Sequence, residues 1–259
     1  MSAGARTEKS CAVGGFGHYS SHIQIRQRVL SSLPNALTIA GLFFGCEAVF
    51  SAINGRLLAS AYLITLASII DVFDGAAARL LGSYSSIGKQ LDSIADTVTV
   101  GIAPTVLLYE AYFRPWHALG VAVAICWTLA VATRLARFNA APPDPSYFRG
   151  LPSPPAANIL SGSVPFSQVV WHHFFNPWIA VALMVVLAVL MLSNVRVEKG
   201  GFFSPEQLVR SGRGRLALLA CLYAALVPWS APFVVFSGLV VLVLIREARR
   251  RVARRVVVS

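Results

Sequence analysis

Acidic residues are scarce in this sequence of 259 residues, which has 11 aspartates and glutamates against 22 lysines and arginines. Charged residues of both signs make up only 13% of the chain. The net charge of +11 would suggest nucleic-acid binding if the basic residues shared one face. They instead separate long apolar runs, so we predict no nucleic-acid partner.

The sequence also lacks a cysteine spacing typical of a metal or redox site. The four cysteines form no CxxC or Cys/His spacing, and three of them fall inside apolar runs, so we interpret them as small packing residues. No short apolar segment with a small-residue cleavage site precedes the first long run. We therefore expect no removable signal peptide and an N-terminus in the cytosol.

Apolar residues are abundant: 56% of the chain is hydrophobic, and the apolar runs repeatedly approach the roughly 20 residues that cross a bilayer. This pattern predicts an all-α fold, a polytopic membrane bundle of about eight transmembrane helices. The predicted spans are 33–53, 57–75, 92–112, 118–138, 156–172, 178–195, 216–229 and 231–246.

The basic residues predict how this bundle is oriented. Placing both termini in the cytosol puts 20 of the 22 lysines and arginines on the cytosolic side and leaves only Arg56 and Arg114 outside. The last two spans are short for a bilayer. One long helix broken at Pro228 or Pro232 is the alternative, but it would place a tail with six arginines outside.

These predictions divide the chain into four regions. Residues 1–32 form a cytosolic N-terminal tail and 33–200 the transmembrane core. Residues 201–246 contain a cytosolic loop and the C-terminal helix pair, and 247–259 form a basic cytosolic tail. Residues 20–35 are either a short interfacial helix or a solvated linker. The connection 141–155 contains six prolines, so we expect it to interrupt the helices on the cytosolic side.

Four of the five aspartates lie within one stretch of 26 residues, DVFDGAAARLLGSYSSIGKQLDSIAD. Asp71 and Asp74 share one face of a helix at about 100° per residue. Asp92 and Asp96 are four residues apart and stack along one face of the next helix. Two antiparallel helices joined by a short turn can therefore direct four carboxylates into one cavity at the cytosolic boundary.

Carboxylates near a membrane are costly unless they are paired, hydrated or bound to metal. Arg79 and Lys89 are the only nearby cations, so the four acids would repel one another unless further cations sat among them. Oxygen ligands without His or Cys suit Mg²⁺, Mn²⁺ or Ca²⁺, and paired metals of this kind commonly serve phosphate chemistry. The interleaved Gly75, Ala78 and Gly88 either admit a substrate close to the backbone or allow close helix packing.

The whole stretch reads D-x-x-D-G-x-x-A-R, eight residues, then G-x-x-x-D-x-x-x-D. It resembles the signature of the CDP-alcohol phosphotransferase family. The resemblance implies transfer of a phosphatidyl-type group from a CDP-linked lipid to an alcohol, release of CMP, and two divalent ions, Mg²⁺ or Mn²⁺. It implies metal binding by Asp71, Asp74, Asp92 and Asp96, with Asp96 also the general base. It implies a CDP pocket formed by Gly75, Ala78, Arg79 and Gly88.

Segments outside the signature resemble the bacterial-type phosphatidylserine synthase branch: LPNALTIAGLFFG, DTVTVGIAPTVLLY, TRLARFN, FRGLPSPPAA and LMLSN. Serine brings a carboxylate, which a fixed arginine binds well. Arg134, Arg137 and Asn139 are therefore the predicted acceptor-site residues, with Arg149 and Lys199 as weaker candidates. The alternative is that Arg134 and Arg137 only anchor the helix end at the cytosolic surface.

The resulting hypothesis is a CDP-diacylglycerol–serine O-phosphatidyltransferase in the bacterial cytoplasmic membrane, with its active site facing the cytosol. Asp96 would take the serine hydroxyl proton, and the oxygen would attack the phosphorus next to diacylglycerol without a covalent enzyme intermediate. The expected partners are CDP-diacylglycerol, L-serine, membrane lipids and, by resemblance, a second copy in a homodimer.

Two other functions stay open. The same reaction could use another acceptor alcohol, such as glycerol 3-phosphate or inositol phosphate. A divalent-cation transporter is the distant alternative, although a conduction site would place the acids nearer the bilayer midplane.

Overall fold

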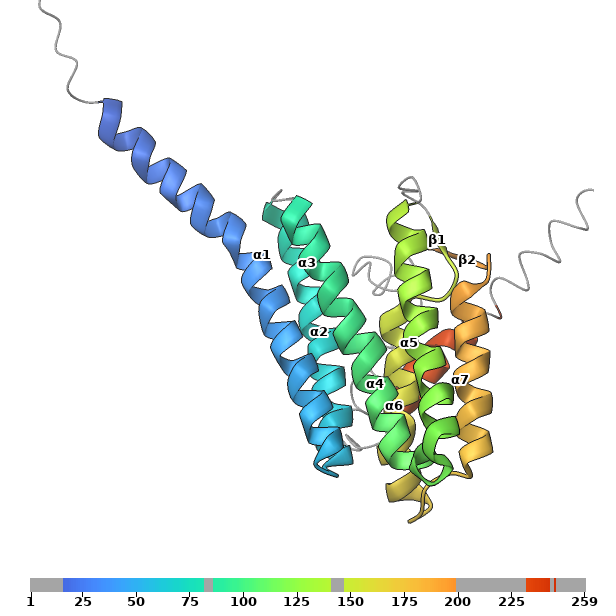
Figure 1. Ribbon diagram of the computed structural model, residues 1–259. Coiled ribbons are helices and arrows are strands. Elements are labelled where there is room, and N and C mark those ends of the chain that lie inside the picture. The colour runs from blue at the N-terminus through green and yellow to red at the C-terminus, as the bar shows by residue number, and fades with distance from the viewer. Residues whose placement is uncertain (1–15, 82–85, 141–146, 199–231, 243–244, 246–259) are drawn as a thin grey trace, which may run out of the picture.

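The computed structural model describes residues 16–81, 86–140, 147–198, 232–242 and 245 (Figure 1). The main helices run side by side as a bundle: α1 (Phe16–Ile53), α2 (Leu57–Leu81), α3 (Ser86–Asp96), α4 (Ala103–Leu108), α5 (His117–Ala140), α6 (Ser153–Val170) and α7 (Pro177–Leu192). Shorter helical turns join α3, α4 and α5: η1 (Thr97–Ile102) and η2 (Tyr109–Phe113), which are π-helical, and η3 (Arg114–Trp116), which is a 3₁₀ turn. A further helix spans Pro232–Leu242.

Helices α1 and α2 form a helical hairpin. The turn between them contains Gly55 with a φ of +74°, and the N–H of Arg56 bonds to the Ser51 carbonyl at 2.9 Å. A left-handed residue at the end of a helix is most easily supplied by glycine. Helix α1 begins well before the predicted first span, and its first part projects beyond the rest of the bundle (Figure 1).

The predicted third and fourth spans form a second hairpin. The chain stays helical from the start of α3 to Phe113 and reverses at His117, which has a φ of +49°. The indole of Trp127 on α5 donates to the Val100 carbonyl at 2.9 Å. A Cβ at Gly120 would overlap the carbonyl of Phe113, so glycine is needed where the two arms of the hairpin meet.

Helix α6 is buried along most of its length, and its first turn contains Pro154, a favourable position for proline. Its polar residues Asn158, Ser161 and Ser167 are completely buried. The hydroxyls of Ser161 and Ser167 bond to carbonyls of the same helix at 2.8 and 2.9 Å. These bonds let hydroxyls occupy an apolar interior at little cost.

Two short strands depart from the all-α prediction. Strand β1 (Tyr147–Arg149) pairs antiparallel with β2 (Arg196–Glu198), with Phe148 opposite Val197. Strand β1 lies in the proline-rich connection 141–155. Proline prevents a helix there and leaves backbone N–H and C=O groups in need of partners, which the strand pair supplies.

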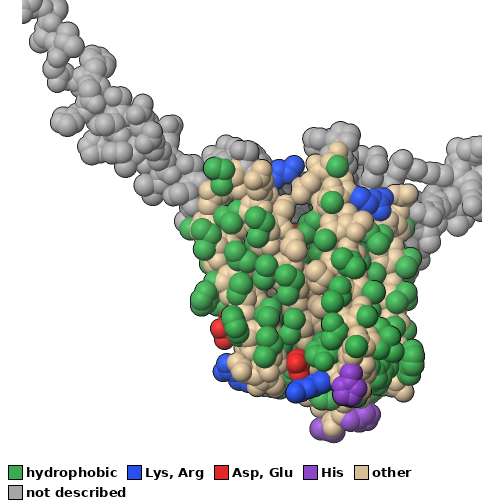
Figure 2. Space-filling view, in the orientation of Figure 1, with side chains coloured by type: hydrophobic (Ala, Val, Ile, Leu, Met, Phe, Trp, Pro, Cys, Tyr) green, Lys and Arg blue, Asp and Glu red, His purple; other side chains and the backbone are tan. Residues whose placement is uncertain are grey.

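Apolar side chains cover the face of the bundle seen in Figure 2, and charged and histidine side chains gather towards its two ends. Phe43, Phe50 and Leu129 are about 60% exposed, as expected for side chains that contact lipid. Within the described residues, three helical stretches are long and apolar enough to cross a membrane: Asn35–Ile53, Leu57–Gly75 and Ile87–Ala140. The protein is a helical membrane protein.

The stretch Ile87–Ala140 contains two predicted spans, because the chain reverses within it. Helix α7 is apolar but shorter than a typical span, and the described residues also include an apolar helical stretch at Pro232–Leu242. The predicted span 216–229 lies outside the described residues, so the expected number of eight stays a prediction.

Candidate active site

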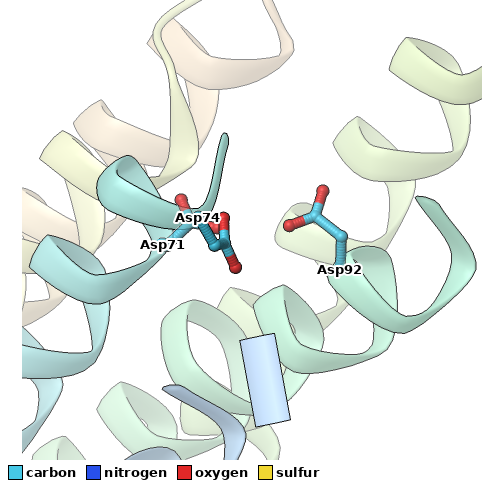
Figure 3. A group of neighbouring side chains, drawn as sticks. All are labelled: Asp71, Asp74 and Asp92. Carbon is cyan, nitrogen blue, oxygen red and sulfur yellow. The ribbon is translucent and has the colours of Figure 1, made fainter. Parts of the chain in front are cut away.

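Three carboxylates converge where α2 faces α3 (Figure 3). Asp71 and Asp74 lie about one turn apart on α2, and Asp92 approaches them from α3. One oxygen from each carboxylate lies within 4.8 Å of the other two. Asp74 is buried, and Asp71 and Asp92 are half-buried. We refer to these three residues as the acidic trio.

Asp96 lies one turn beyond the trio, at the end of α3. It is close enough to Asp71 and Asp92 to interact with them electrostatically. The chain then enters the π-helical turn η1, where the Thr99 hydroxyl bonds to the Ala95 carbonyl at 2.9 Å. The four predicted acids are thus a tight group of three with the fourth beside it.

The buried member of the trio has a partner on a third helix. Thr38 of α1 donates its hydroxyl to Oδ2 of Asp74 at 2.7 Å, and the two side chains are 6% and 5% exposed. Hydrogen bonds to an ionised carboxylate are stronger than those between neutral groups. Helix α1 therefore holds the Asp74 carboxylate without adding a positive charge to the site.

Arg134 extends from α5 towards the segment that precedes α6, and its side chain is 9% exposed. Its Nε donates to the Leu151 carbonyl at 3.0 Å, and its Nη1 donates to the Ser153 hydroxyl at 2.7 Å. Asp96 is near enough for its charge to act on the guanidinium. A buried cation thus lies beside the fourth acid.

The other two predicted acceptor residues are exposed near the end of α5. Arg137 donates to the Leu192 carbonyl at 2.6 Å and to Oδ1 of Asn194 at 3.1 Å, so it caps the end of α7. Asn139 donates to the Ser93 hydroxyl at 3.0 Å. These contacts connect the end of α5 to α7 and to α3.

The predicted nucleotide-binding residues continue from the trio. Gly75 follows Asp74 directly on α2, and Gly88 lies on α3 one turn before Asp92; both glycines are half-buried. The next turn of α2 contains Ala78 and Arg79, whose side chains lie outside the described part of the structure. Of the two weaker acceptor candidates, Arg149 lies in strand β1 and Lys199 lies outside the described residues.

The donor set and spacing of the acidic trio fit a divalent metal. Mg²⁺ and Ca²⁺ bind oxygen at about 2.0–2.6 Å, so two oxygens on one ion lie at most about 4–5 Å apart. The spread of 4.8 Å falls within this range. The carboxyl groups of Asp71 and Asp92 also approach within hydrogen-bonding reach of each other. As two anions they would repel at this separation, and a cation between them would remove the repulsion.

Comparison with known proteins identifies the class of enzyme. The model of the CDP-alcohol phosphatidyltransferase family matches residues 31–246, and the chain belongs to this family. It is therefore a membrane-bound transferase of the CDP-alcohol phosphatidyltransferase class, as the signature in the sequence indicated.

Several curated relatives narrow the comparison further. The chain is 32% identical over 168 residues to the CDP-diacylglycerol–serine O-phosphatidyltransferase of Helicobacter pylori (strain ATCC 700392 / 26695), covering 63% of this chain and 70% of the relative. It is 30% identical over 181 residues to the enzyme of that name from Mycobacterium tuberculosis (strain ATCC 25618 / H37Rv), covering 66% and 62%. The Bacillus subtilis (strain 168) enzyme of that name is 29% identical over 184 residues, covering 71% and 99%.

Sequence reasoning did not assign roles to Thr38 or Ser153. Both lie in segments that resemble the phosphatidylserine synthase branch, but neither is part of the acidic signature. The only local signal at Thr38 is a hydroxyl within an apolar run. A hydroxyl in a helix commonly bonds to its own backbone, so that signal does not identify a partner on another helix.

Proposed function

We propose that this protein transfers a phosphatidyl group from CDP-diacylglycerol to the hydroxyl of L-serine, giving phosphatidylserine and CMP. The observation that carries the proposal is the convergence of Asp71, Asp74 and Asp92 within 4.8 Å inside the family signature. The names of the relatives support serine as the acceptor.

The residues that would hold metal are the acidic trio together with Asp96. Divalent ions bound there, two Mg²⁺ or Mn²⁺ by resemblance, would neutralise the diphosphate and stabilise charge on the departing CMP. Next to them, Gly75 and Gly88 offer no side chain that would keep a nucleotide away from the backbone. Ala78 and Arg79 complete the proposed CDP pocket by resemblance to the family.

Asp96 is the proposed general base. It lies beside the trio rather than within it, so its carboxylate can contact an acceptor hydroxyl. The base takes the hydroxyl proton while the serine oxygen forms a bond to the phosphorus next to diacylglycerol. The bond from that phosphorus to the CMP oxygen breaks, and CMP leaves without a covalent enzyme intermediate.

Arg134 is the strongest candidate for recognition of the serine carboxylate, because it is a buried cation close to Asp96. Burial strengthens the attraction between a cation and a carboxylate by excluding water. Arg137 and Asn139 lie further along α5 and already contact α7 and α3. We propose that they assist by fixing the rim of the acceptor site.

The proposal places the site on the cytosolic side of the bacterial inner membrane, with both termini in the cytosol. Arg56 and Arg114 lie at the helix ends opposite the trio, which agrees with the positive-inside rule. Trp116 and Trp178 pack at 4.9 Å near that opposite end, where an aromatic belt is expected. A homodimer and the four-region division of the chain are part of the same proposal.

A single assay tests the activity. Protein purified in detergent is supplied with CDP-diacylglycerol, L-serine and a titration of Mg²⁺ or Mn²⁺, and the lipid product is identified by mass spectrometry. Phosphatidylserine and CMP should form in equal amounts with metal and not with EDTA. A phosphatidylglycerol phosphate or phosphatidylinositol phosphate product from the matching acceptor, without phosphatidylserine, would change the acceptor but keep the reaction.

Two variants test the roles in the proposed mechanism. Asp96→Asn should lower kcat by at least about 100-fold, because general-base catalysis typically contributes that much. Glu110→Gln, at the far end of the hairpin and paired with the exposed Arg114, is the matched control and should keep activity. Near-normal turnover of Asp96→Asn would contradict a general-base role for Asp96. Metal uptake into proteoliposomes without CDP-lipid, and no lipid product, would favour a transporter.

A further inference from the structure

We propose that Thr38 positions the Asp74 carboxylate for metal binding, so that a helix outside the signature helps to build the metal site. This inference depends on the proposed function, because it assumes that the acidic trio binds a divalent cation. It goes beyond that function by assigning a role to a residue of α1.

The contact itself is short and shielded. The hydroxyl of Thr38 and Oδ2 of Asp74 are 2.7 Å apart, and the two residues are separated by 36 positions in the chain. Both side chains are more than nine-tenths buried, so water competes little for either group. A hydroxyl bonded to an ionised carboxylate under these conditions fixes the rotation of that carboxylate.

The bond differs from most hydroxyl contacts in the described helices. Thr65, Ser68 and Thr99 each donate to the carbonyl four residues earlier in the same continuous helical stretch, at 3.1, 3.0 and 2.9 Å. Those bonds do not link one helix to another. The Thr38 bond links α1 to α2 and ends on a carboxylate of the acidic trio.

Electrostatics explain why a neutral donor suits this position. The three carboxylates of the trio repel one another, and without restraint Asp74 would rotate away from Asp71 and Asp92. A lysine or arginine could hold it, but a positive charge there would compete with the metal. A threonine hydroxyl restrains one oxygen and leaves the negative charge of the group available to a cation.

The test compares three variants of the full-length purified enzyme. Thr38→Val keeps the branched shape and removes the donor, Thr38→Ser keeps the donor and removes a methyl group, and Thr65→Val is the matched control. Mn²⁺ binding is measured without substrate, from the free-Mn²⁺ signal in electron paramagnetic resonance. The metal concentration that gives half-maximal activity is measured separately.

Loss of a partner of a metal ligand typically costs 10- to 100-fold in metal affinity. Thr38→Val should therefore weaken Mn²⁺ binding by about 10-fold or more, while Thr38→Ser and Thr65→Val stay within about 3-fold of wild type. At saturating Mn²⁺, kcat of Thr38→Val should recover to within about 3-fold of wild type. If Thr38→Val does not fold, Thr38→Ala and Thr38→Ser decide the matter, because only the second retains a hydroxyl.

Three results would overturn the inference. Unchanged Mn²⁺ affinity in folded Thr38→Val would remove the positioning role while leaving the proposed function intact. Equal losses in Thr38→Val and Thr38→Ser would assign the effect to packing. Wild-type protein that binds no Mn²⁺ but still makes phosphatidylserine would remove the metal site, and this inference with it, without removing the reaction.

Discussion

The guanidinium of Arg134 donates to the Ser153 hydroxyl at 2.7 Å, which joins the buried part of α5 to the first residue of α6. The same guanidinium donates to the Leu151 carbonyl at 3.0 Å. The side chain therefore has a fixed direction before any substrate arrives. Asp96 lies close enough for its charge to act on this guanidinium.

Replacement of Arg134 should reveal whether this cation recognises the acceptor. Arg134→Gln should raise the serine KM by at least about 10-fold, since a hydrogen bond to a charged group is worth about 1.5–3 kcal/mol. The KM for CDP-diacylglycerol should stay within about 3-fold. Arg134→Lys should recover only part of the effect, because an ammonium cannot reproduce the two directed donors of the guanidinium.

Steady-state kinetics with each substrate varied in turn measure these changes, and Arg114→Gln at the exposed opposite end is the control. A lower melting temperature with an unchanged serine KM would make Arg134 a purely structural residue.

The backbone before α6 should tolerate no side chain at Gly150. This glycine has a φ of +76°, and a Cβ there would overlap the Met191 carbonyl and lie 2.9 Å from the Ser193 carbonyl oxygen. Gly55 is the matched control, because its φ is +74° but a Cβ would meet nothing within 4 Å. Gly55→Ala should cost about 1–2 kcal/mol of unfolding free energy for the left-handed backbone alone.

Gly150→Ala should cost at least about 2 kcal/mol more, because overlap with backbone atoms adds to the same strain. The unfolding free energies of both variants are measured by titration with a denaturing detergent. Equal losses in the two variants would contradict the close approach of this loop to the end of α7.

Removing one charge from the acidic trio, or binding a metal there, should make the folded protein more stable. In EDTA, Asp92→Asn should melt at the same temperature as wild type or higher, because one of three like charges is removed. With Mn²⁺ at 100 times its dissociation constant, wild type should gain about 2.7 kcal/mol, and Asp92→Asn should gain far less.

Thermal unfolding in detergent, with and without Mn²⁺, measures both effects, and Glu110→Gln should behave as wild type. A variant that is less stable than wild type in EDTA would mean that Asp92 supports the fold through contacts rather than straining it.

The sequence was informative where one helix is enough to define a relationship. Asp71 and Asp74 are close because they are three residues apart on a helix, and this spacing predicted their shared face. The convergence of Asp92 from the next helix also followed, because helices that are consecutive in the sequence usually pack as neighbours. The membrane character followed from the long apolar runs.

Contacts between distant segments could not be predicted in the same way. Nothing local in the sequence pairs Thr38 with Asp74 across 36 residues, or Arg134 with Ser153 across 19. Helical periodicity also gave no signal for strand β1, because its three residues are too short to display an alternating pattern. Such contacts depend on how whole helices pack, which one sequence specifies only indirectly.

The bond from α1 to Asp74 also bears on how such enzymes can be recombined. Every aspartate of the signature lies after the turn at Gly55, so a chimaera that exchanges only the later segment would inherit all four acids. It would receive the first helix of the other parent, with whatever residue that parent has opposite Asp74. Grafts intended to transplant the metal chemistry should therefore move the first hairpin together with α3, as one unit.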